Sequence, residues 1–201
     1  MHIFISSKKF TYSMIYSNGK VAGILFFIAA AQFILGLIVA EALYPGYSIS
    51  TNYISDLGVG PSSLVFNTSI FLLGLLSLIG TYFLYRAYNL KVITILLTIA
   101  ALASMGVGIF TENSEPMHMV VSFFAFLCSG LSAIFSYRLM KHPFSIIVIL
   151  LGGISLLAMI LFIGNFYFGL GVGGMERMIV YPILIWMIGF GGFLMEFPEK
   201  S

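Results

Sequence analysis

Charged side chains are scarce in this sequence: Lys, Arg, Asp and Glu make up 8% of 201 residues, against 60% hydrophobic residues. So few charges cannot cover the surface of a water-soluble globule of this size. The mean hydropathy of +1.09 points the same way. We therefore expect an integral membrane protein.

Other features are missing as well. A single cysteine, Cys128, excludes an intramolecular disulfide. No basic cluster accompanies the net charge of +2, so no nucleic-acid partner is expected. A Walker loop, a serine-hydrolase elbow and a paired-cysteine metal motif are also absent. Residues 1–20 lack the cleavable apolar core of a signal peptide and are interpreted as a cytoplasmic tail.

Six long apolar runs dominate the rest of the chain. Each can cross a hydrocarbon core of about 30 Å as a helix, the element that satisfies its own backbone hydrogen bonds in lipid. The runs cover about residues 21–43, 63–86, 92–111, 117–139, 144–168 and 176–195. The predicted fold is all-α: one six-transmembrane-helix bundle, polytopic, over residues 21–195, with a second cytoplasmic tail at 196–201.

Basic residues predict how the bundle is oriented. Eight of the nine Lys and Arg residues fall on one side of the six runs: Lys8, Lys9, Lys20, Arg86, Lys91, Arg138, Lys141 and Lys200. Because cytoplasmic loops are enriched in Lys and Arg, we expect a multi-pass protein of the cell membrane with both termini cytoplasmic. Arg177 falls on the other side, together with most of the acidic residues.

A candidate site is expected on that extracytoplasmic side. Three polar patches recur there, at residues 52–58, 112–118 and 169–177. Ionisable groups at membrane depth are costly, so they usually pair, bind an ion or line a wet cavity. The supporting polar residues of the predicted pocket are Asn52, Ser55, Asn67, Asn165 and Glu176.

The glycine-rich patch suggests an anion site. Gly171, Gly173 and Gly174 precede the last run, and Arg177 follows them. Free backbone N–H groups at a helix start suit a phosphate, and an arginine would clamp it. At this depth the ligand would be a lipid or a lipid-linked anionic head group, so membrane lipids are the expected partners. This is the working hypothesis for function.

Two other interpretations of the same residues stay open. In one, Arg177 forms structural ion pairs with Asp56 and Glu112 and needs no ligand. In the other, the chain is a metal-dependent lipid hydrolase. Its candidate metal ligands are Asp56, Glu112, His118 and Glu176, the first three being the candidate catalytic residues.

No cofactor is predicted beyond that possible divalent metal. Because the chain has such short loops, an accessory subunit of a larger membrane complex is a further alternative, and a homo-oligomer is also compatible with the sequence. Whether the chain is an enzyme stays open.

The polar motifs together resemble a known family. They comprise Asn52 with Ser55-Asp56-Leu57-Gly58, Asn67, Gly106-x-Gly108-x-Phe110-x-Glu112 leading to His118, and Gly-Val-Gly-Gly-Met-Glu176-Arg177 before a Trp-containing last run. The combination is similar to the six-helix membrane proteins of domain of unknown function 998, over about residues 20–195. The resemblance implies the six-helix fold and brings no established activity.

Overall fold

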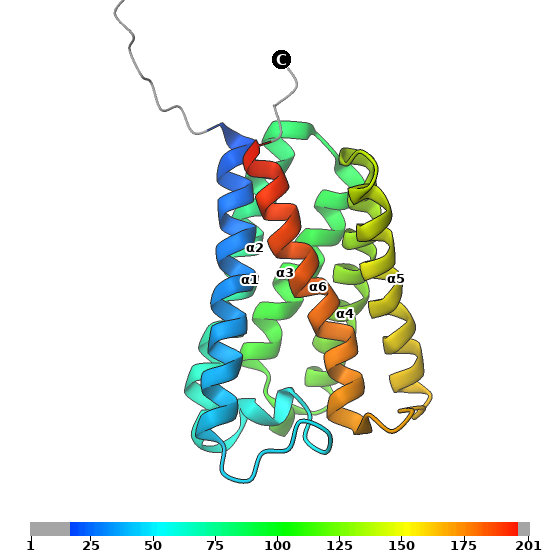
Figure 1. Ribbon diagram of the computed structural model, residues 1–201. Coiled ribbons are helices and arrows are strands. Elements are labelled where there is room, and N and C mark those ends of the chain that lie inside the picture. The colour runs from blue at the N-terminus through cyan, green and yellow to red at the C-terminus, as the bar shows by residue number, and fades with distance from the viewer. Residues whose placement is uncertain (1–16, 197–201) are drawn as a thin grey trace, which may run out of the picture.

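Six long helices make up the protein in a computed structural model that describes residues 17–196 (Figure 1). They are α1 (Asn18–Leu43), α2 (Ser63–Tyr88), α3 (Lys91–Ile109), α4 (Met117–Phe135), α5 (Phe144–Ile163) and α6 (Gly171–Glu196). Four short 3-10 helices join them: η1 (Ser55–Gly58), η2 (Gly60–Ser62), η3 (Glu112–Ser114) and η4 (Ser136–Leu139). Six spans, each covering one of the long helices, are long and apolar enough to cross a membrane, so the predicted all-α, six-span fold class is confirmed.

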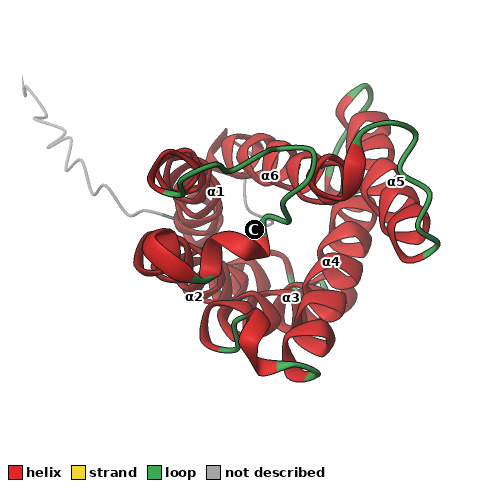
Figure 2. Cartoon of the chain, turned by 90° about the horizontal axis from the view of Figure 1, so that it is seen from below, coloured by secondary structure: helices red, strands yellow, loops and turns green. Residues whose placement is uncertain are grey.

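The helices form a ring with one helix outside it. Successive helices from α1 to α4 lie side by side, and α6 returns to pack against α1. The contact between α4 and α6 is sparse, and α5 packs on both of them from outside (Figure 2). The ring therefore has its weakest seam between α4 and α6, and α5 covers that seam.

Glycines lie where helix backbones come closest. A Cβ atom added to Gly23 in α1 would lie 2.5 Å from the carbonyl oxygen of Gly191 in α6. One added to Gly152 in α5 would lie 2.6 Å from the carbonyl oxygen of Gly130 in α4. Lipid supplies no hydrophobic drive for helix association, so such close approach is how membrane helices gain packing energy.

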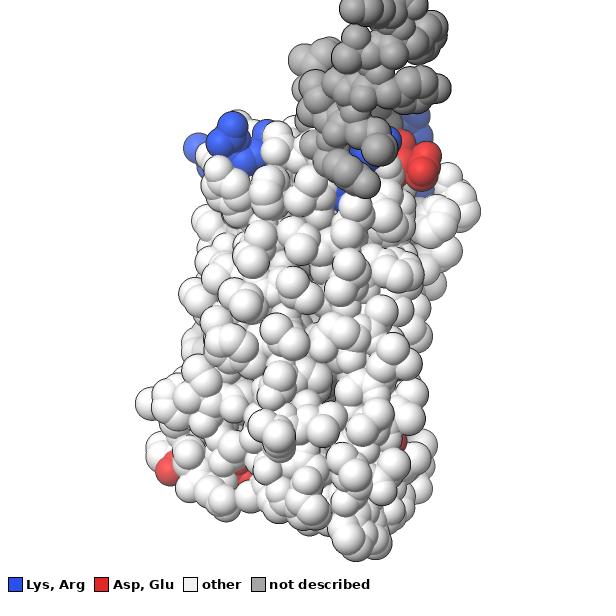
Figure 3. Space-filling view, turned by 90° about the vertical axis from the view of Figure 1, so that its left-hand side faces the viewer, with Lys and Arg blue, Asp and Glu red and all other residues white. Residues whose placement is uncertain are grey.

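The two ends of the bundle differ in charge (Figure 3). Among described residues, Lys20, Arg86, Lys91, Arg138 and Lys141 lie at the end where α1 begins and α6 ends, which we call the basic end. The opposite, acidic end carries the 44–62 connection and the turns after α3 and α5. Lys8, Lys9 and Lys200, and most of both predicted tails, lie outside the described residues. The cytoplasmic assignment of the termini stays a prediction.

Two helix boundaries differ from expectation around residues 164–175. Helix α5 ends at Ile163 rather than near 168, because Asn165, Phe168 and Gly169 adopt left-handed backbone conformations, which a right-handed helix cannot contain. Helix α6 begins at Gly171, five residues earlier than expected. The glycine-rich patch is therefore the first turn of a helix and not a loop.

Candidate functional site

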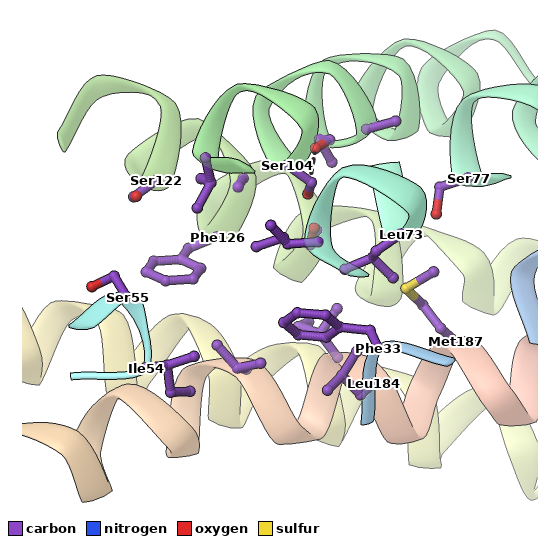
Figure 4. Close-up of a pocket in the computed structure, with 18 of the residues that line it drawn as sticks. Phe33, Ile54, Ser55, Leu73, Ser77, Ser104, Ser122, Phe126, Leu184 and Met187 are labelled. Atoms are coloured by element: carbon purple, nitrogen blue, oxygen red, sulfur yellow. Dashed lines mark hydrogen bonds between the residues drawn. The ribbon is translucent and has the colours of Figure 1, made fainter. Parts of the chain in front are cut away.

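A mostly apolar cavity of about 850 Å³, including its open mouth, lies inside the ring. Its lining comes from α1, η1, α2, α3, α4 and α6, and includes Phe33, Leu73, Leu97, Phe126, Leu184 and Met187. Figure 4 shows several of these side chains directed into one common space.

Polar groups meet at the acidic end of this cavity. Glu176 of α6 is 6% exposed, and its Oε2 accepts a hydrogen bond of 2.5 Å from the N–H of Ile54. The hydroxyl of Ser55 donates to Oε1 of Glu112. Ile54, Ser55 and Glu176 all line the cavity. The three polar patches of the sequence are thus brought together by η1, η3 and the first turns of α6.

Asp56 organises the loop rather than facing the cavity. Its Oδ2 accepts hydrogen bonds of 2.9 Å from Nδ2 of Asn52 and from the N–H of Tyr53. Oδ1 of Asn52 accepts a further bond of 3.1 Å from the N–H of Ser48. These contacts fold residues 48–56 into a compact turn, because an Asn or Asp side chain replaces backbone partners that the loop lacks.

The surroundings of Glu112 favour the protonated form of its carboxyl group. Burial raises the pKa of its carboxyl group to about 7; the carboxyl groups of Asp56 and Glu115 also raise it, while the hydrogen bond from Ser55 lowers it. A carboxyl group with such a pKa holds or releases a proton near neutral pH. Glu112, which lies outside the membrane-spanning helices, is therefore suited to exchange a proton at the acidic end.

Arg177 is held by the loop and by α1. It forms an ion pair of 2.6 Å with Glu41, and it also donates to the hydroxyl of Tyr47 at 2.7 Å. Its other terminal nitrogen donates to the carbonyl oxygens of Ile49 and Gly173. The expected ion-pair partners were Asp56 and Glu112; Glu41 at the end of α1 takes that place. The side chain of Arg177 is 5% exposed, and it does not line the cavity.

The glycines at the start of α6 let the 44–62 connection pack closely against this helix. The N–H of Gly173 donates to the carbonyl oxygen of Ser50 at 3.1 Å. A Cβ atom at Gly173 would lie 2.6 Å from the carbonyl oxygen of Ile49, and one at Gly171 would collide with the backbone of Ser50. Gly174 faces its own preceding turn at Leu170. The loop therefore occupies the side of α6 on which an anion was expected.

His118 lies apart from the carboxylates. Its Nδ1 is 2.7 Å from the carbonyl oxygen of Phe110, and its Nε2 is 3.3 Å from the hydroxyl of Ser122. It thereby joins the start of α4 to the end of α3. Across residues 17–196, no group of three or more His, Cys, Asp and Glu side chains is placed to hold a metal ion. The four candidate ligands of the hydrolase interpretation do not form one cluster.

The other two asparagines of the predicted pocket, Asn67 and Asn165, make different contacts. Asn67 in α2 donates to the carbonyl oxygen of Gly58 at 3.0 Å, while its Oδ1 is buried without a partner. Asn165 is exposed and accepts a bond from the hydroxyl of Tyr167 in the turn after α5. It does not line the cavity, and neither does any residue of α5, which lies outside the ring.

Serines inside the cavity were not expected as site residues. Ser77, Ser104, Ser122 and Ser129 line it from α2, α3 and α4. Ser104 donates to its own helix at Ala100, whereas the hydroxyl of Ser77 is buried without a partner. The sequence signal was a row of small polar residues at helical spacing, which is equally typical of packing seams.

Comparison with known proteins shows the family of the chain through its sequence. A family model described as "Protein of unknown function (DUF998)" matches residues 27–192, which is most of the chain. No curated protein and no solved structure matches it.

Proposed function

The chain belongs to the DUF998 family of membrane proteins, and we propose that it binds a membrane lipid, with the apolar chain of the lipid inside the helix ring and its head at the acidic end. One observation carries this proposal: the apolar cavity between the membrane-spanning helices has Ser55 and Glu176 in its lining at the acidic end. An amphiphile matches that division into an apolar body and a polar end.

The physical reason for a lipid is the chemistry of the lining. Apart from a few hydroxyls and Glu176, the cavity is lined by aliphatic and aromatic side chains. Wall atoms around an empty space lose their dispersion contacts, and a hydrocarbon chain would restore them. A water-soluble polar ligand would find few hydrogen-bond partners along this lining, and its desolvation would be uncompensated.

We also infer that the acidic end is extracytoplasmic. The basic residues at the opposite end support this orientation, because positively charged loops are retained in the cytoplasm. A lipid would then reach the site from the outer leaflet. The labelling experiment in the Discussion tests the orientation separately from lipid binding.

Native mass spectrometry of the gently solubilised chain tests the proposal. We expect about one lipid per chain to survive purification, and Ala101→Phe to remove it by filling the cavity, which Ala101 lines at 2% exposure. Leu102→Phe is the matched control, because Leu102 is 53% exposed on the outer surface of the same helix. Lipid retained equally by both variants, or absent from the unmodified chain, would overturn the proposal.

A further inference from the structure

The polar groups that face the cavity carry no positive charge. Of the described residues that line it, the polar ones are Ser55, Ser77, Ser104, Ser122, Ser129 and Glu176. Serine hydroxyls accept and donate hydrogen bonds, and a carboxylate only accepts them. The cavity therefore offers hydroxyl groups, one acid and no cation to neutralise an anionic ligand.

The surroundings reinforce this preference at the acidic end. Glu176 is buried and accepts a hydrogen bond from the N–H of Ile54. The hydroxyl of Ser55 donates a hydrogen bond to the carboxyl group of Glu112. Arg177, the single described cation near this end, is already paired with Glu41. In their ionised forms these carboxyl groups attract an ammonium group and repel a phosphate.

An independent observation marks the inner part of the cavity as built for a ligand. The hydroxyl of Ser77 is 6% exposed, has no hydrogen-bond partner and points into the cavity beside Met187 (Figure 4). A buried hydroxyl without a partner is costly, and native proteins rarely leave one unexplained. From Phe66 to Ser77, the lining of α2 spans roughly 16 Å at 1.5 Å per residue.

We propose that the ligand is a long-chain lipid amine, whose ammonium head binds at Glu176 and Ser55 and whose chain runs along α2 toward Ser77. This inference rests on the proposed function and specifies its ligand class. An ammonium group supplies three donors, which match the carboxylate of Glu176 and the oxygen of Ser55. The unpaired hydroxyl of Ser77 would bond a second polar group carried on the lipid chain, which the simple alkyl probes used below lack.

Three probes that differ in their heads test this class: tetradecylamine, tetradecanol and tetradecyl phosphate. Each is titrated against the full chain in nanodiscs of phosphatidylcholine, with binding followed by native mass spectrometry. We expect the amine to bind at least about tenfold more tightly than the phosphate, since the buried carboxylate faces the head. Loss of probe binding in the Ala101→Phe variant, with binding kept in the Leu102→Phe variant, would show that the probe binds in the cavity.

Charge at one position is then removed. Glu176→Gln keeps an acceptor oxygen for the N–H of Ile54, so its loss of charge is the main change. We expect it to weaken amine binding about tenfold and to leave alcohol binding unchanged. Glu115→Gln is the matched control, because Glu115 is an exposed carboxylate at the same end that does not line the cavity.

The outcomes separate the two proposals. Phosphate binding as tight as amine binding, or equal weakening of all three probes by Glu176→Gln, would overturn the amine class while lipid binding stands. If Glu176→Gln does not fold, the comparison of the three heads on the unmodified chain still decides the class. If no probe and no copurified lipid occupies the cavity, both proposals fail.

Discussion

Glu176 and Arg177 are consecutive residues of α6, yet they face different surroundings: Glu176 lines the central cavity, and Arg177 is clamped between Glu41 and the loop at Tyr47. Neighbouring residues of a helix point about 100° apart, so one step of the chain turns from the cavity to the loop. The acidic character of the cavity and the anchoring of the loop are therefore set by two adjacent side chains.

Loss of the arginine should destabilise the fold rather than weaken a ligand. Arg177→Ala leaves Glu41 without its partner and frees the loop, and we expect a cost of about 3 kcal/mol in unfolding free energy, typical of breaking a largely buried pair. Thermal unfolding in detergent measures it. The double variant Glu41→Gln with Arg177→Met should recover part of that stability; no recovery would mean that the pair itself is not the source of the cost.

A methyl group at Gly173 should separate the loop from α6. Gly173→Ala would push against the carbonyl oxygens of Ile49 and Asn52, and we expect a loss of about 1–3 kcal/mol, the usual cost of overpacking. Gly189→Ala is the matched control in the same helix, because nothing lies within 4 Å of its added Cβ. There the helix preference of alanine should raise stability by up to about 1 kcal/mol. Equal melting temperatures for the two variants would contradict this.

Stability should depend on pH through Glu112. Its pKa of about 7 in the folded chain lies above the ordinary value of 4.5, so the folded state binds the proton more tightly than the unfolded state. Protonated Glu112 stabilises the folded state. This contribution is fully present below the ordinary pKa of 4.5 and is lost as the pH rises to about 7. Melting temperature should fall between about pH 5 and about pH 8, and Glu112→Gln should flatten that fall.

Glu115→Gln serves as the control for this pH dependence. The side chain of Glu115 is exposed, so its removal should change the slope far less than Glu112→Gln does. An unchanged slope in Glu112→Gln would show that another group at the acidic end causes the pH dependence. The measurement needs only thermal unfolding at a series of pH values.

Single cysteines test the orientation. In a Cys128→Ala background, Ser50→Cys and Ser114→Cys lie in the loops of the acidic end and should react with an impermeant maleimide on intact cells. Lys141→Cys, exposed at the basic end, should react after permeabilisation. The reverse pattern would place the termini outside the cytoplasm.

The glycine-rich patch illustrates how a local motif becomes ambiguous. Glycines followed by an arginine at a helix start are typical of anion sites, and the sequence analysis predicted one there. In the structure, the loop at Ile49 and Ser50 lies against those glycines, and its carbonyl oxygens take the hydrogen bonds that an anion would need. Which partner fills a helix start depends on chain segments more than 100 residues away, and spacing in the sequence does not encode that.

The sequence by itself determined the fold class, the six spans, the charge difference between the two ends and the meeting of the three polar patches at one end. These follow from hydrophobic length and from the alternation of antiparallel helices, both of which are properties of single segments. Only the tertiary structure decided that Arg177 pairs with Glu41, that His118 stays with Phe110 and Ser122, and that a cavity lies between α1–α4 and α6. The rotation of each helix about its axis decides those contacts, and in an apolar environment that rotation is set by close packing between neighbours, which no single segment specifies.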